Sequence, residues 1–155
     1  MVEKKYECFD VEIENNIAHI RMNRPEKLNS MNKSFWNDLP EIVEDIDINA
    51  RARVIVISST GKHFSAGMDL SVFAPQPKMF RSNVKRIQHS FNALEEARIP
   101  VLFALHGGVI GGAIDMISAG DIRWCSKDAI FCIQETNIGM TADVGTFPRL
   151  VKLIP

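Results

Sequence analysis

Three carboxylic acids stand in apolar or small-residue surroundings and could move protons: Asp115, Glu135 and Asp143. None of them has a lysine or arginine beside it in the sequence that would pair with it. Burial raises the pKa of a carboxyl group, and neighbouring carboxylates raise one another's pKa, which suits general acid–base catalysis near neutral pH. Asp115 and Asp143 have an alternative use as helix caps, since Asp is common where a helix begins.

Two turns rich in small residues follow apolar runs and could bind an oxygen atom through backbone N–H groups. Residues 64–70 read Phe-Ser-Ala-Gly-Met-Asp-Leu, and residues 106–113 read His-Gly-Gly-Val-Ile-Gly-Gly-Ala. The second turn opens a predicted helix, whose first N–H groups have no partner inside the helix and carry partial positive charge. Two such donors aimed at one point could hold a thioester oxygen as it gains negative charge, and each is worth about 3 kcal/mol. The alternative is that the glycines serve only tight turns and close helix packing. The glycines do not form a GxGxxG or GxxxxGK[ST] pattern, which disfavours a dinucleotide or P-loop site.

The elements that must position these groups alternate between strand and helix patterns. Such alternation predicts an α/β layered domain with mostly parallel strands, whose active site collects at the carboxyl ends of the strands. The first two strands are expected to form a hairpin that turns at Asn15-Asn16. Asn32 is expected to cap the first helix, and Pro40 to kink or restart it. The predicted strands are Phe9–Ile13, Ile17–Met22, Val54–Ile57, Val101–Leu105, Asp121–Cys125 and Ala129–Ile133, and the predicted helices are Asn32–Asn49, Val84–Ala97, Ala113–Ala119 and Val144–Leu153.

The composition is that of an ordinary globular domain and disfavours several classes of protein. The 155 residues, 46% of them hydrophobic, are expected to form one domain with its own core. A formal net charge of -1 provides no basic field for nucleic acid. No segment approaches the roughly 20 apolar residues of a membrane-spanning helix, and the first residues lack a signal-peptide core. Cys8, Cys125 and Cys132 show no CxxC spacing, which fits a reducing intracellular compartment and disfavours disulfides or a metal site.

Three segments resemble motifs of the crotonase (enoyl-CoA hydratase/isomerase) superfamily, in matching order and spacing. They are the NRP segment Asn23–Asn32, the AG-x-D segment Phe64–Leu70 and the GG-x-x-x-GGG segment Gly107–Asp115, with Ala113 where the family usually has a third glycine. The resemblance covers the chain from about Phe9 onward. It implies an α/β fold, the crotonase-like ββα spiral of stacked, mostly parallel strands with flanking helices. It also implies that a C-terminal helical part is missing, so that residues 1–155 are the N-terminal portion of a catalytic domain.

The segment Ile133–Thr146 and the Phe35-Trp36 pair are similar to the Δ3,5-Δ2,4-dienoyl-CoA isomerases of that superfamily. Those enzymes have a third acid where Asp143 stands and an Asp where Asp115 stands. The resemblance implies isomerisation of 3,5-dienoyl-CoA to 2,4-dienoyl-CoA in the β-oxidation of unsaturated fatty acids. Two alternatives stay open: hydration of a 2-enoyl-CoA by Asp115 and Glu135, and a truncated, non-catalytic CoA-binding subunit.

The resemblance also implies a role for each candidate residue. Glu135 would take the C2 proton and Asp143 would deliver a proton at C6, or the reverse, while Asp115 orients Glu135. Backbone N–H groups would form an oxyanion hole for the thioester oxygen, and the first turn would contact CoA. Arg24 and Lys27 would either meet the CoA phosphates or serve only as surface charges. The oxyanion-hole candidates are Ala66, Met68, Gly112 and Ala113, and the CoA-binding candidates are Arg24, Lys27, Ala66, Gly67, Met68, Asp69 and Leu70.

The same resemblance sets the expected partners and compartment. No metal and no separate cofactor are expected, because coenzyme A is part of the acyl-CoA substrate. The family forms homotrimers or hexamers, whose contacts the missing C-terminal part normally builds. It works in mitochondria, in peroxisomes or in the bacterial cytoplasm.

Overall fold

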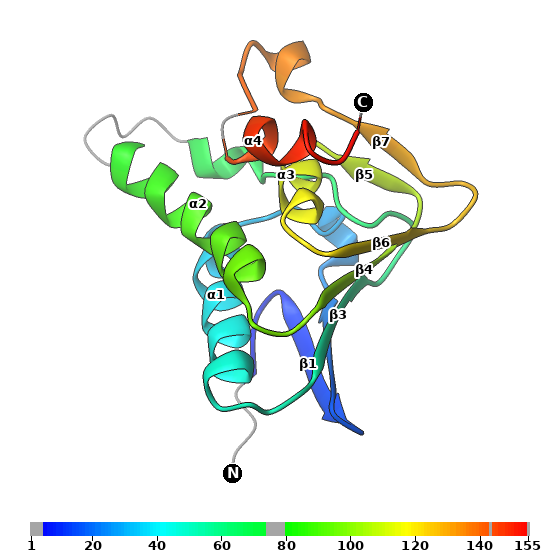
Figure 1. The fold of residues 1–155 in the computed structure, drawn as a ribbon. Helices are drawn as coiled ribbons and strands as arrows, with labels where there is room; N and C mark the ends of the chain where they lie inside the picture. The colour runs from blue at the N-terminus through cyan, green and yellow to red at the C-terminus, as the bar shows by residue number, and fades with distance from the viewer. Residues whose placement is uncertain (1–4, 74–79, 143, 155) are drawn as a thin grey trace.

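The computed structural model describes residues 5–73, 80–142 and 144–154 as two β-sheets with helices packed around them (Figure 1). The larger sheet has the strand order β1-β2-β3-β4-β6, and the smaller sheet pairs β5 with β7. Within the described ranges, β1 and β2 pair antiparallel and all other neighbouring strands pair parallel. The strands are β1 (Phe9–Glu14), β2 (Ile17–Met22), β3 (Val54–Ser59), β4 (Val101–Leu105), β5 (Gly108–Ile110), β6 (Ile122–Cys125) and β7 (Ile130–Cys132). The α-helices are α1 (Lys33–Ile48), α2 (Phe80–Glu96), α3 (Gly112–Ser118) and α4 (Thr146–Leu150), and short 3-10 helices cover Pro25–Lys27, Leu70–Phe73 and Glu135–Ile138.

The opening hairpin is confirmed, and its turn explains its register. Asn15 and Asn16 have φ angles of 51° and 65°. Positive φ at both central residues is what a two-residue hairpin turn of the favoured hand requires, and Asn tolerates it. The turn pairs Glu14 with Ile17 and Phe9 with Met22. This register directs alternate side chains of β2 into the core.

Helix α1 starts at the predicted cap and then continues through Pro40. The Asn32 side chain accepts a hydrogen bond from the backbone N–H of Phe35 at 3.0 Å. Pro40 cannot donate to the carbonyl of Trp36, four residues before it, because proline has no N–H. The hydroxyl of Ser90, buried on α2, lies 2.8 Å from that carbonyl oxygen, and 3.0 Å from the carbonyl oxygen of Arg86. A neighbouring helix therefore satisfies the acceptor that Pro40 leaves open, and the predicted second segment does not form.

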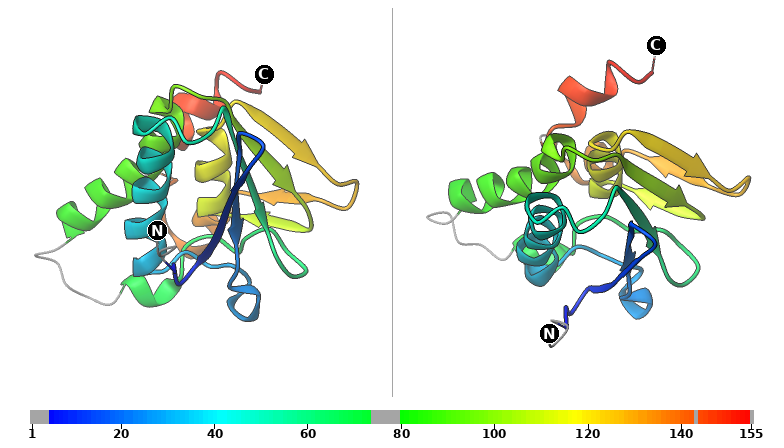
Figure 2. Two further views of the ribbon diagram at one scale, coloured as in Figure 1. Left: turned by 90° about the horizontal axis from the view of Figure 1, so that it is seen from below. Right: turned by 60° about the horizontal axis from the view of Figure 1, so that its bottom comes forward.

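Aromatic side chains fix α2 against α1 and the first strand. The ring of Phe35 lies 4.9 Å from that of Phe9 and 5.2 Å from that of Trp36, centroid to centroid. Trp36 in turn meets Phe91 of α2 at 5.4 Å, with the rings edge to face. Such geometry adds about 0.5–1.5 kcal/mol per pair beyond the burial of area. Figures 1 and 2 show α1 and α2 side by side, with α3 deeper in the molecule.

The chain after β4 differs from the sequence prediction in three places. The glycine-rich segment contains a short strand, β5, which pairs with β7 and not with the main sheet. The two predicted strands after α3 consequently belong to different sheets, β6 beside β4 and β7 beside β5. Helix α4 is shorter than predicted: it starts at Thr146, after Gly145 with its left-handed φ of 100°, and it ends at Leu150, after which the chain forms turns. Over the three described ranges, no helix is long and apolar enough to cross a bilayer.

Candidate active site

One cavity of about 420 Å³ brings together both predicted turns and two of the three predicted acids. Asp115 and Glu135 line it, together with the candidates Ala66, Met68, Asp69, Leu70 and Gly112. The remaining lining residues are Ser30, Gly111, Gln134, Ile138, Met140, Thr141, Ala142 and Val144. The third acid, Asp143, lies outside the described residues, although its neighbours in sequence on both sides line the cavity.

The first turn presents the backbone N–H of Met68 to the cavity. The N–H of Met31 donates to the carbonyl of Gly67 at 2.8 Å, and the N–H of Asp69 donates to the carbonyl of Met31 at 3.1 Å. In a parallel bridge of this kind the middle residue, Met68, directs its own N–H to the opposite side. The N–H of Ala66 is already used, because it donates to the carbonyl of Leu28 at 2.9 Å.

The second turn brings the N–H of Gly112 to the same space. Gly112 is the first residue of α3, so its N–H has no acceptor inside the helix. A methyl group added at Gly112 would lie 3.5 Å from the Met68 nitrogen and 3.9 Å from Asp115 Oδ2. The two amides and the Asp115 carboxyl therefore surround one small volume. Ala113 is fully buried and is not part of the cavity lining, so its methyl group does not occupy that volume.

Gly67 allows the two turns to approach this closely. Its φ is +81°, and a Cβ there would lie 2.5 Å from the carbonyl oxygen of Ile110 and 2.9 Å from the nitrogen of Gly112. Both distances are far below what a side chain tolerates. Gly67 itself does not line the cavity, so what it provides is the contact between the two turns.

The two described acids enter the cavity from separate elements. Asp115 lies on the first turn of α3 and is 2% exposed. Glu135 begins the 3-10 helix Glu135–Ile138, and its Oε1 would lie 3.2 Å from a Cβ at Gly111. Oε2 of Glu135 is shielded from solvent and accepts no hydrogen bond from any residue that the structure describes. A shielded carboxylate oxygen with spare acceptor capacity is what proton abstraction from carbon needs.

Arg24, predicted to meet CoA phosphates or to serve as a surface charge, ties two loops together. Its Nη1 donates to the carbonyl of Ser30 at 2.8 Å and pairs with Asp69 Oδ2 at 3.3 Å, where both side chains are mostly shielded. The side chain and the backbone N–H of Ser71 also donate to Asp69. These hydrogen bonds, first those from Ser71 and then that from Arg24, lower the pKa of Asp69 to about 2. Lys27 is exposed. Contact of Arg24 or Lys27 with the CoA phosphates stays a prediction.

Sequence reasoning missed two polar residues that hold the first turn in place. Asn29 is buried, with φ of 52°, and its side-chain amide donates to the carbonyl of Thr60 at 2.7 Å and accepts from the N–H of Arg24 at 2.8 Å. Ser65 is also buried, and its hydroxyl donates to the carbonyl of Asn29 at 2.9 Å and accepts from the N–H of Gly67 at 3.0 Å. An Asn shortly after a Pro-containing turn was the available signal for the first of these. Within the described part of the chain, no cluster of three or more His, Cys, Asp or Glu could hold a metal ion.

Comparison with known proteins agrees with the fold and the motifs. The family model for enoyl-CoA hydratase/isomerase matches residues 12–155. The mitochondrial Δ(3,5)-Δ(2,4)-dienoyl-CoA isomerase of Pongo abelii is 41% identical, over 98% of this chain and 50% of its own length. The peroxisomal protein of the same name from Arabidopsis thaliana is 34% identical, over 97% of this chain and 59% of its own. A solved structure of a putative enoyl-CoA hydratase from Thermobifida fusca YX, in complex with acetoacetyl-CoA, is 27% identical with a TM-score of 0.85, covering 95% of this chain and 62% of that one.

An α/β fold with these two turns around one cavity defines a crotonase-type protein, and the predicted fold class is confirmed. The chain belongs to the enoyl-CoA hydratase/isomerase family. It spans about half the length of the mitochondrial isomerase of Pongo abelii.

Proposed function

We propose that this chain carries the acyl-CoA-binding and catalytic residues of a dienoyl-CoA isomerase, which converts 3,5-dienoyl-CoA to 2,4-dienoyl-CoA. The observation that carries the proposal is the shared volume between the amides of Met68 and Gly112, with a buried carboxyl beside it. A thioester oxygen there would receive two backbone hydrogen bonds, which stabilise the negative charge of an enolate. The relatives named as dienoyl-CoA isomerases support the choice of this reaction.

The proposed reaction moves one proton out and one proton in. Glu135 removes a proton from C2, the electron pair of that C–H bond forms a C1–C2 double bond, and the carbonyl pair moves onto the thioester oxygen to give the enolate. When the oxygen pair re-forms the carbonyl, the C1–C2 pair becomes C2–C3, the C3–C4 pair becomes C4–C5, and the C5–C6 pair takes a proton at C6, so that the double bonds stand at C2 and C4. Asp143 delivers the C6 proton, a role that rests on the sequence resemblance alone, and the reverse assignment of the two acids stays open. Asp115 orients Glu135.

The lining of the cavity suits a reaction without water. Met68, Met140 and Val144 contribute apolar surface to the lining of this cavity. Exclusion of water strengthens the hydrogen bonds to the enolate and disfavours its protonation by solvent. Hydration of a 2-enoyl-CoA by Asp115 and Glu135 is the second candidate, because those two acids line one cavity.

Substrate comparison tests the proposal directly. Purified chain is mixed with 3,5-dienoyl-CoA and, separately, with 2-enoyl-CoA, while the ultraviolet absorbance of each mixture is followed. Isomerisation of the first compound brings its double bonds into conjugation with the thioester, so the absorbance of the conjugated system rises. Hydration of the second compound removes that conjugation, so the absorbance falls. Glu135→Gln keeps the size of the side chain but removes the base, so isomerisation is expected to be lost with CoA binding retained.

Three other outcomes would each overturn the proposal. Hydration without isomerisation supports the hydratase. Calorimetric binding of an acyl-CoA without turnover supports a non-catalytic CoA-binding subunit. If no acyl-CoA binds, these residues serve no function that involves an acyl-CoA.

The setting of the reaction is part of the same proposal. The named relatives are mitochondrial or peroxisomal proteins, and we propose β-oxidation of unsaturated fatty acids in one of these compartments. Fractionation of cells that express the tagged, native-length protein would test this. The trimeric or hexameric state expected from the family stays a prediction, which sedimentation of the same protein would address.

A further inference from the structure

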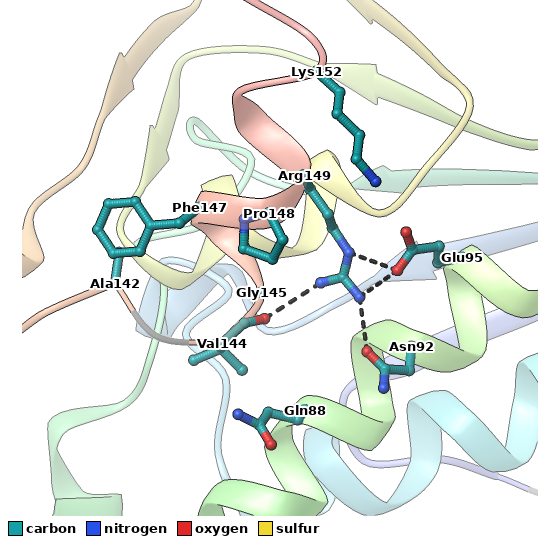
Figure 3. Close-up of a pocket in the computed structure, with 10 residues that line it drawn as sticks. All are labelled: Gln88, Asn92, Glu95, Ala142, Val144, Gly145, Phe147, Pro148, Arg149 and Lys152. Carbon is teal, nitrogen blue, oxygen red and sulfur yellow. Dashed lines mark hydrogen bonds and ion pairs between the residues drawn. The ribbon is translucent and has the colours of Figure 1, made fainter.

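A second cavity, of about 350 Å³, adjoins the active-site cavity (Figure 3). Ala142 and Val144 line both cavities and are buried, and we refer to these two residues as the shared wall. The two spaces therefore meet at the shared wall, and what lies on either side of it determines what each space can hold.

The shared wall is the buried end of the active-site cavity. Leu70 and Ile138 of the same lining are 66% and 50% exposed, so they lie at its mouth. Among the described apolar side chains of the lining, only Ala142 and Val144 are buried. Methylene groups gain most free energy where they leave water for apolar surface. An acyl chain whose thioester oxygen is held by the two amides would therefore extend toward the shared wall.

The space behind the shared wall has a different chemistry. Polar and charged side chains of α2 and of the region around α4 line it, namely Gln88, Asn92, Glu95, Arg149 and Lys152. Methylene groups that passed the wall would displace water from these groups without replacing its hydrogen bonds, which costs free energy. The wall thus separates an apolar end, suited to an acyl chain, from a polar space that is not.

A buried guanidinium holds the backbone of Val144 against α2. The side chain of Arg149 is 6% exposed, and its Nη1 donates to the carbonyl of Val144 at 3.3 Å (Figure 3). Its Nε and Nη2 donate to one carboxylate oxygen of Glu95 at 2.8 and 2.7 Å, and Nη2 also donates to the side-chain oxygen of Asn92 at 2.7 Å. Gly145 leaves room for the guanidinium, because a Cβ at that position would overlap Nη1.

This attachment gives Val144 the rigidity that discrimination between chain lengths requires. A residue at the end of a cavity excludes a longer chain only if it does not yield when that chain presses on it. Moving Val144 away would break a shielded hydrogen bond to a charged donor, and such bonds are among the stronger ones in proteins. The side chain of Val144 therefore has a fixed place at the end of the active-site cavity.

We propose that Val144 is a specificity-determining residue, whose side chain is the end stop for the acyl chain of the substrate. Arg149 is the positioning residue that keeps this end stop in place. The inference rests on the proposed function, since it concerns the same cavity and the same acyl-CoA substrates. It adds the class of acyl chain that the site accepts: chains that end at the shared wall, with longer ones excluded by Val144.

Val144→Ala and Val144→Ile test the end stop from both directions. The first shortens the side chain and lengthens the space for the acyl chain, and the second does the reverse. Val43→Ala and Val43→Ile are the matched controls, because Val43 is buried on α1 and lines neither cavity. Each protein is assayed for kcat/KM with a series of 3,5-dienoyl-CoA substrates that differ by methylene groups at the end far from the thioester. The thermal midpoint of each variant is measured as well.

The expected result is a shift of the chain-length profile in opposite directions. One methylene group in an apolar pocket changes kcat/KM by about tenfold. Val144→Ala should raise kcat/KM by about that factor for the first substrate that is too long for the wild type, relative to the longest one accepted. Val144→Ile should lower kcat/KM by a similar factor for the longest accepted substrate. The proposal is wrong if both Val144 variants keep the profile of the Val43 variants, or if the wild type shows no length limit.

Arg149→Lys tests the positioning role separately. A single ammonium group cannot reach two side chains and a backbone carbonyl in one fixed geometry, so the end stop should yield. A folded Arg149→Lys protein should therefore accept longer chains, in the direction of Val144→Ala. Arg98→Lys makes the same change in an exposed ion pair with Asp47, away from both cavities, and should keep the wild-type profile. Equal profiles for the two lysine variants would end the positioning role of Arg149.

Failure of the proposed function would look different. In that case the wild-type chain would isomerise none of the 3,5-dienoyl-CoA substrates. Calorimetric affinities for saturated acyl-CoA thioesters of the same lengths then replace kcat/KM. A shifted affinity profile in Val144→Ala, but not in Val43→Ala, supports the end stop without the isomerase, and an unshifted profile refutes it. If no acyl-CoA binds to the wild type, both the proposed function and the end stop are wrong.

Discussion

Gly112→Ala should strongly reduce activity while leaving the fold intact, because its added methyl group enters the space between the two amides. The methyl carbon would lie 3.5 Å from the Met68 nitrogen, 3.7 Å from Met31 Sδ and 3.9 Å from Asp115 Oδ2. These are ordinary van der Waals distances, so the chain needs no rearrangement to accept the side chain. Gly112 also has no positive φ, and alanine is favoured over glycine in a helix by about 0.5–1 kcal/mol. The folded protein should be as stable as the wild type, or slightly more stable.

The cost for catalysis follows from the size of the same space. A thioester oxygen held by Met68 and Gly112 would sit about 2.9 Å from each nitrogen. A methyl group that faces the Met68 amide leaves no room for an oxygen at that distance, so at least one hydrogen bond to the enolate is lost. Loss of one such donor costs about 3 kcal/mol, which is roughly 10²-fold or more in kcat.

The assay measures kcat and KM for 3,5-dienoyl-CoA together with the thermal midpoint by circular dichroism. Ala113→Gly is the matched comparison, since it makes the reverse change one residue further along α3 and keeps the backbone N–H. It removes a methyl group from the core and should lower the midpoint without a comparable loss of kcat. Wild-type turnover by a folded Gly112→Ala protein would refute the assignment of the Met68–Gly112 space to the thioester oxygen.

Three further predictions concern the surroundings of the site. Ser90→Ala should lower the free energy of unfolding by about 1–3 kcal/mol, because a buried carbonyl loses its donor; in a Pro40→Ala background, where the helix N–H is restored, urea denaturation should show a smaller loss. Because the pKa of Asp69 is lowered to about 2 from 3.8, its carboxylate adds stability above pH 3.8 that disappears as the pH falls toward 2. Asp69→Asn should therefore lose less stability than the wild type over that range, and parallel acid titrations of the two proteins would contradict the prediction. Burial, and then the charge of a nearby glutamate, raise the pKa of the Cys8 thiol to about 11, so iodoacetamide at mildly alkaline pH should label exposed Cys125 first, as peptide mass spectrometry would show.

Local patterns were sufficient to predict the elements whose causes are local. The Asn15-Asn16 turn and the Asn32 cap act within a few residues, and the apolar runs of β3 and β4 need only burial to form strands. Pro40 was predicted to kink the helix or to start a second segment, and the second segment does not form; the hydroxyl that compensates for Pro40 comes from another helix, which the sequence pattern does not reveal. Strand β5 was missed for a similar reason, since the partners of this glycine-rich segment, β7 and Ser65, come from other parts of the chain.

The same distinction applies to the site. The motifs identified the two turns and the acids, but the choice between the N–H of Ala66 and that of Met68 depends on which one already has an acceptor. The carbonyl of Leu28, in a loop distant in the sequence, accepts a hydrogen bond from the N–H of Ala66. Met31 forms backbone hydrogen bonds with the two residues that flank Met68. Such pairings come from tertiary structure, and a one-dimensional pattern does not contain them. Arg149 was not among the predicted site residues, because its partners are two α2 side chains and a backbone carbonyl, which only the folded chain brings together.

The supports of the site come from two sides of the cavity. The Met68 amide is fixed from one side, through the Arg24–Asp69 ion pair and the hydrogen bonds of Met31. Val144, which also lines the cavity, is held from the other side, through Arg149 and α2. Within the described ranges, no hydrogen bond or ion pair joins these two groups of supports, so a change in one should leave the other in place. A catalytic site that relies on preorganised donors depends on both groups remaining rigid.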